Sequence, residues 1–131
     1  MRVPREDREN EKRTIAERLA DLDPGIEIND GPARYLSLQV GRRKPNNCIV
    51  IARNVDRVSF LIPEQEIRSF VEESGFSVQP KPSRTKAFRG SEYWVKGVTS
   101  AAIERHSELF RKLVLRSRQF VEDLHKGVTH G

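Results

Sequence analysis

Two segments of this chain concentrate its basic side chains, and phosphate binding is the chemistry that they favour. Residues 34–57 carry six basic residues against one acid, Asp56, and residues 80–96 carry five against one acid, Glu92. The two segments therefore hold net charges of +5 and +4, while the rest of the chain holds −4. Arginine outnumbers lysine in them, which suits bidentate contact with phosphate oxygens.

Within each segment the bases alternate with Gly, Pro, Asn and Ser, which are loop-forming residues. We name residues 41–47 the first basic loop and residues 81–89 the second basic loop. If both loops project from the same edge of a sheet, they form a positive rim that attracts the phosphates of DNA or RNA. An ordinary solvated surface and a site for an acidic partner are the alternatives for the same charges. The sequence leaves the choice between DNA and RNA, and between single and double strands, open.

Aromatic residues flank both loops, and unpaired bases stack on exposed aromatic rings. Tyr35 begins the strand before the first basic loop, and Phe88, Tyr93 and Trp94 lie in or just after the second. Tyr93 and Trp94 are neighbours, so one of them faces away from the core if the strand is regular. The predicted nucleic-acid contacts are Arg42, Arg43, Lys44, Arg53, Arg84, Lys86, Arg89, Tyr93 and Trp94.

Residue patterns typical of enzymes and metal sites are absent from the sequence. It has neither a Walker-type phosphate loop nor a G-x-G-x-x-G segment. The three histidines share no metal-ligand spacing and Cys48 is the only cysteine, so we expect no metal and no cofactor. Cys48 lies in an apolar run and is expected to pack as a small hydrophobic residue. A metal-free ribonuclease that uses His106, Arg89 and Tyr93 is an alternative function, because that chemistry needs only positioned cations and an acid–base group.

The two acids of the basic segments are expected to form local ion pairs. Asp56 has Arg53 and Arg57 beside it, and Glu92 has Lys96 four residues later.

The apolar pattern predicts the elements that hold these loops. Alternating or continuous apolar runs predict strands, and three- and four-residue spacings predict helices. Helices are expected at 5–22, 63–74 and 100–126, and strands at 26–29, 34–40, 48–52, 58–62, 76–79 and 91–98. Short connections between consecutive strands favour a mostly antiparallel sheet. The predicted fold is α+β: a single two-layer domain with five to six strands and the long C-terminal helix packed on them.

The chain is expected to divide into a charged N-terminal helix or extension (1–23), the α+β domain (24–126) and a short tail (127–131). The last helix carries more apolar residues than one face needs, at Leu109, Phe110, Leu113, Val114 and Leu115. A protein-interaction module that dimerises or binds a partner through this helix is therefore the other alternative function.

Length and composition exclude several classes of protein. The chain has 131 residues, enough for one domain of ordinary size. It has no run of roughly 18 apolar residues, so no membrane association is expected, and a single cysteine excludes a disulfide scaffold. Residues 1–20 lack the apolar core of a secretory signal, so a cytoplasmic location is expected.

Overall fold

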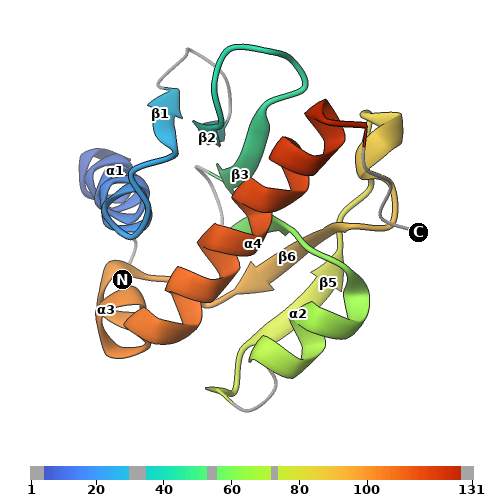
Figure 1. The fold of residues 1–131 in the computed structure, drawn as a ribbon. Helices are drawn as coiled ribbons and strands as arrows, with labels where there is room; N and C mark the ends of the chain where they lie inside the picture. The colour runs from blue at the N-terminus through green and yellow to red at the C-terminus, as the bar shows by residue number, and fades with distance from the viewer. Residues whose placement is uncertain (1–4, 30–34, 53–55, 72–73, 128–131) are drawn as a thin grey trace.

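A six-stranded antiparallel sheet forms the centre of the protein (Figure 1). The structure is a computed structural model that describes residues 5–29, 35–52, 56–71 and 74–127. The strands are β1 (Glu27–Asn29), β2 (Tyr35–Gln39), β3 (Asn47–Ala52), β4 (Arg57–Leu61), β5 (Ser77–Pro80) and β6 (Glu92–Lys96). Their order across the sheet is β1-β2-β3-β4-β6-β5. The predicted α+β class and the antiparallel sheet are confirmed.

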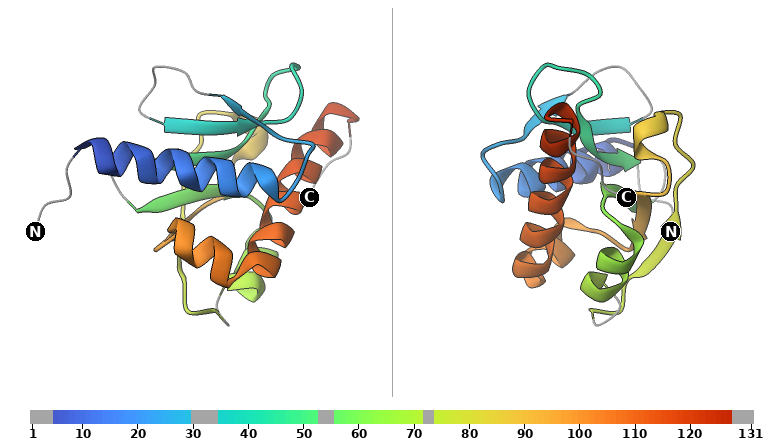
Figure 2. Two further views of the ribbon diagram at one scale, coloured as in Figure 1. Left: turned by 90° about the vertical axis from the view of Figure 1, so that its left-hand side faces the viewer. Right: turned by 45° about the vertical axis from the view of Figure 1, so that its right-hand side comes forward.

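The α-helices cover one face and the β1 edge of this sheet. They are α1 (Arg5–Asp21), α2 (Glu64–Val71), α3 (Ser100–Arg105) and α4 (Ser107–His125), with a short 3-10 helix, η2 (Lys86–Phe88). Figure 1 shows α4 crossing in front of the strands, and it contacts β3 and β4 at the centre of the sheet. Figure 2 shows α1 from the side, along the edge formed by β1 and β2. The packing of the C-terminal helix on the sheet is confirmed.

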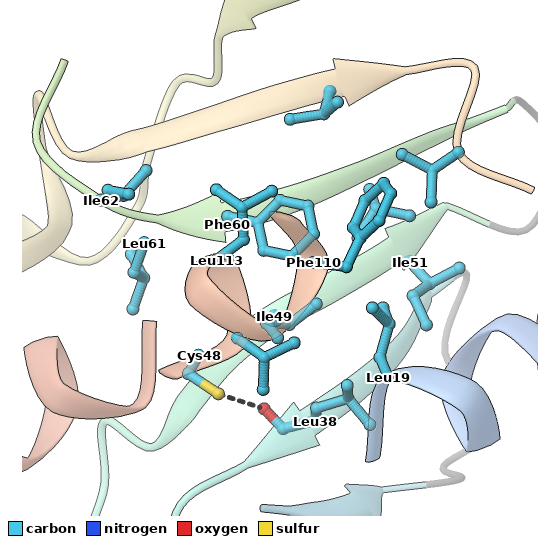
Figure 3. Close-up of a cluster of buried hydrophobic side chains, with 14 of the residues drawn as sticks. Leu19, Leu38, Cys48, Ile49, Ile51, Phe60, Leu61, Ile62, Phe110 and Leu113 are labelled. Carbon is cyan, nitrogen blue, oxygen red and sulfur yellow. Dashed lines mark hydrogen bonds between the residues drawn. The ribbon is translucent and has the colours of Figure 1, made fainter. Parts of the chain in front are cut away.

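One hydrophobic core lies between α4 and the sheet (Figure 3). Alternate strand residues such as Leu36, Leu38, Ile49 and Ile51 point into it, because successive side chains of a strand face opposite sides. The helices contribute buried side chains to the same core, among them Ile15, Leu19, Phe110, Leu113 and Val121. The C-terminal half of α1 therefore packs on the domain through Ile15 and Leu19.

The strand order brings the two basic loops to one end of the sheet. The first basic loop joins the end of β2 to the start of β3, and the second basic loop joins the end of β5 to the start of β6. Each strand from β2 to β5 runs antiparallel to its neighbours in the sheet, so β2, β4 and β5 run in one direction and β3 and β6 in the other. The ends of β2 and β5 and the starts of β3 and β6 therefore lie at the same end of the sheet, as does Leu61 at the end of β4, opposite Glu92. Figures 1 and 2 show both loops beside the C-terminal end of α4.

The expectation of one continuous helix over residues 100–126 is wrong. The helical chain breaks at His106, whose φ of −117° and ψ of 42° are not helical. The α3 segment packs on α1, where Ser100 N–H donates to Glu11 and Arg18 pairs with Glu104. The α4 segment crosses β3 and β4, so the chain changes direction at His106 between these two sets of contacts.

Candidate functional site

The first basic loop is held in place by contacts with its own backbone and with the end of α4. The side-chain amide of Asn46 donates to the Gly41 carbonyl over 2.7 Å, and the Val40 N–H donates to the Asn46 carbonyl. Arg43 donates to the backbone carbonyl of His125 over 2.9 Å, where the final carbonyls of a helix lack intrahelical partners. This contact also places a cation at the negative end of the α4 dipole. Arg42 and Lys44, on either side of Arg43, are exposed.

The second basic loop folds around the buried carboxylate of Glu92. Lys81 Nζ lies 2.5 Å from one carboxylate oxygen, and the Ser83 hydroxyl donates to the other. Ser83 Oγ also accepts from the Thr85 N–H, which leads the chain into η2. Phe88 of η2 is 4% exposed and packs edge-on against Phe120 of α4 at 5.9 Å between ring centres. The loop is therefore anchored at both ends, with Arg84, Lys86 and Arg89 exposed between the anchors.

Together the loops form a surface that we call the basic rim. Its members are Arg42, Arg43, Lys44, Arg84, Lys86 and Arg89, all of which are exposed. Within the described part of the chain, none of them lies at ion-pair distance from a carboxylate. Helix arginines behave differently, since Arg116 pairs with Glu66 at 2.7 Å and Arg118 with Asp23 at 3.1 Å. The rim charge is therefore not neutralised by neighbouring acids of the described residues.

Tyr93 and Trp94 face opposite sides of the sheet, as their adjacency predicts, but neither ring is exposed to solvent. Tyr93 is 6% exposed in the hydrophobic core, and its hydroxyl donates to the Gly90 carbonyl. Trp94 is 5% exposed on the opposite face, which we call the open face because the helices do not cover it. The Arg57 guanidinium lies 4.4 Å from the centre of the Trp94 ring, and Lys81 Nζ lies 5.4 Å from it. Neither ring can receive a stacked base in this arrangement.

Sequence reasoning noted Tyr35 but did not include it among the predicted contacts, and it is the exposed ring of this region. Tyr35 is 40% exposed and lies 6.4 Å from Trp94 between ring centres. Its place in the alternation of β2, beside Ser37 and away from Leu36 and Leu38, was the signal that pointed to the open face. Arg53, which the sequence also predicts as a contact, lies outside the described residues.

The expected ion pair between Glu92 and Lys96 is wrong, because Glu92 pairs with Lys81 instead. Asp56 also pairs with a residue distant in the sequence, while its expected partner Arg53 lies outside the described residues. Asp56 accepts from Lys12 of α1 at 3.1 Å. Glu92 pairs with Lys81 across the β5–β6 turn, whereas Lys96 lies at the far end of β6. Sequence proximity misleads here, since residues four apart on a strand lie about 13 Å apart.

The candidate catalytic groups do not converge. His106 packs edge-on against Phe76, with 5.5 Å between the ring centres, at the end of the sheet where β6 ends. Arg89 lies at the opposite end, where β6 begins. Burial, and then the nearby Glu64 carboxylate, raises the pKa of Tyr93, which keeps its phenol neutral.

Burial also raises the pKa of the Cys48 thiol to about 12, as fits the predicted packing role. Among the residues with a described position, no cluster of His, Cys, Asp or Glu is arranged to hold a metal ion.

Comparisons with known proteins give no family or relative for this chain. No protein-family model, no curated protein and no solved structure matches it. Across the described segments, no helix has both the length and the apolar character needed to cross a membrane.

Proposed function

We propose that the protein binds nucleic acid through its backbone phosphates, without catalysing a reaction on it. The observation that carries this proposal is the basic rim, in which two anchored loops hold six exposed cations at one end of the sheet. Each phosphate that such a cation neutralises releases condensed counterions, so binding gains free energy at low salt. Loops that are already held in place lose little conformational entropy on binding.

The exposed surface of α4 gives the protein-interaction alternative less support. Phe110, Leu113 and Val114 are completely buried against the sheet and the other helices. Leu115, at 38% exposed, and Tyr35 are the large apolar side chains exposed within the described residues. A single exposed leucine is ordinary on a protein surface and does not form an apolar patch.

Charge-removing variants test this proposal. Arg42→Ala/Lys44→Ala and Lys86→Ala/Arg89→Ala each remove two rim cations and lower the net charge from +5 to +3. The matched control is Arg111→Ala/Lys112→Ala, which makes the same charge change at two exposed positions of α4. Fluorescence anisotropy of labelled DNA and RNA oligonucleotides gives the affinity of each variant over a range of salt concentrations.

If the rim binds phosphates, each rim variant lowers affinity for all oligonucleotide sequences and flattens the salt dependence. The slope of log affinity against log salt concentration falls in magnitude by about 1 to 2 for two lost phosphate contacts. The α4 control keeps a slope close to that of the unmodified protein. Equal losses in the rim variants and the control would show that only net charge matters, and would contradict a localised interface.

A further inference from the structure

A pocket of about 750 Å³ opens on the open face, next to the second basic loop. Ser37 of β2 and Val50 of β3 lie opposite each other in register and line its floor. The segment from Lys81 to Thr85 lines one wall and carries Arg84 of the basic rim. This size falls within the range of about 300–1,000 Å³ typical of small-ligand sites. It suits one nucleotide of a strand, whereas a base pair within a duplex cannot enter a concave site of this kind.

One aromatic ring that lines the pocket is exposed for stacking and has a second aromatic ring beside it. Tyr35 lines the pocket and is 40% exposed. Trp94 lies beside it, and Arg57 and Lys81 cover Trp94. Stacking on an aromatic face is open to every base, because each base has its own π-face.

Polar groups around the same pocket fit the edges and the phosphate of a nucleotide. Ser37 and Asn47 supply a hydroxyl and an amide, each of which can donate and accept hydrogen bonds. Arg84 supplies a cation that has no carboxylate partner among the described residues. The one carboxylate in the lining, that of Glu92, is already occupied by Lys81 and Ser83. It therefore adds little repulsion toward a phosphate at Arg84.

We infer that this pocket takes one unpaired base of a single-stranded nucleic acid, with the base on Tyr35 and its phosphate at Arg84. The inference rests on the proposed function, because the strand continues from the pocket over the basic rim. A pocket of this kind restricts the proposed partner to nucleic acids with unpaired bases. It also assigns a binding role to Tyr35, Ser37 and Asn47.

The test compares a filled pocket with an intact one. Ser37→Phe places a ring over the pocket floor, and phenylalanine is well accommodated in strands. Gln39→Phe is the matched control, since Gln39 lies on the same face of the same strand and does not line the pocket. Each protein is titrated with a single-stranded oligonucleotide and with a blunt duplex of the same length. Anisotropy measures affinity, and quenching of Trp94, the only tryptophan, reports occupancy beside Tyr35.

The inference predicts that the single strand binds at least about tenfold tighter than the duplex and quenches Trp94. Ser37→Phe removes most of this preference and the quenching, while Gln39→Phe retains both. Equal affinity for both oligonucleotides, unchanged by Ser37→Phe, would overturn the pocket assignment and leave the phosphate interface standing. Failure of the unmodified protein to bind any oligonucleotide at low salt would instead overturn the proposed function, and this inference with it.

Discussion

The carboxylate of Glu92 organises the second basic loop. It is 6% exposed, and each of its oxygens is occupied, one by Lys81 and the other by Ser83. A buried carboxylate is tolerated only when it is paired and hydrogen-bonded. The three residues therefore act as a unit that keeps Lys81 against Trp94 and directs the chain toward Arg84.

Glu92→Gln is predicted to destabilise the protein by about 1–3 kcal/mol, because it leaves Lys81 without its counterion in a partly buried position. Chemical denaturation, followed by circular dichroism, measures this change. Glu64→Gln is the control, since its pair with Arg68 is largely exposed and contributes less than about 1 kcal/mol. Equal effects of the two substitutions would contradict the organising role of Glu92.

Cys48 is predicted to be inert in the folded protein. The residue is 1% exposed, and its Sγ donates to the Leu38 carbonyl, as Figure 3 shows. A thiol-reactive chromophore should label it only after unfolding, because the thiolate is the reacting species. Fast labelling of the native protein at mildly alkaline pH would refute the packing in Figure 3.

The Cys48 thiol makes the free energy of unfolding depend on pH in the alkaline range. Burial raises its pKa from the ordinary value of 9.0 to about 12, so in this range the folded state holds a proton that the unfolded state has lost. The free energy of unfolding of the native protein therefore falls as pH rises through this range. The Cys48→Ala variant should lose less stability over the same range, and parallel losses in the two proteins would contradict this assignment.

At the scale of elements, the apolar pattern predicted all six strands. The alternation in residues 34–40 also predicted the buried side of β2, where Leu36 and Leu38 are buried. The runs around Leu36, Ile49 and Phe60 have the two-residue period or continuous apolar character of strands, and all three residues are buried. The pattern does not say which strands pair. The sequence order of β5 and β6 gave no sign that β6 lies between β4 and β5, because long-range pairing depends on packing that local periodicity does not record.

The break at His106 was missed for a related reason. Residues on both sides keep three- and four-residue apolar spacing, so the stripe alone reads as one helix. The direction changes because α3 packs on α1, and that contact joins residues nearly ninety positions apart, such as Glu11 and Ser100. The two basic loops were found from composition, whereas their common end of the sheet required the strand order.

Thr99 caps α3, and its removal should weaken the contact between α3 and α1. Its hydroxyl accepts from the Ala102 N–H over 3.1 Å. Thr99→Ala is predicted to cost about 1 kcal/mol in the free energy of unfolding, whereas Thr99→Ser keeps the hydroxyl and most of the stability. Denaturant midpoints of the two variants decide this, and an equal loss in both would argue against a capping role.

At the scale of the whole molecule, the two faces of the sheet carry different kinds of residues. The face under α4 carries the hydrophobic core, while the open face carries Tyr35, Ser37 and Arg57. The basic rim lies at the end of the sheet where the strands reverse, next to the pocket of the open face. The proposed phosphate contacts and the proposed base contact would therefore come from adjoining surfaces of one domain.

The central claim is a phosphate-binding rim, and the salt dependence of oligonucleotide binding by the unmodified protein tests it most directly. If all six rim cations contact phosphates of a single strand, log affinity falls against log salt concentration with a slope of about −4. Binding that is strong at low salt and follows a slope of this size would support the claim. Absence of binding at low salt, or binding that salt leaves unchanged, would contradict it.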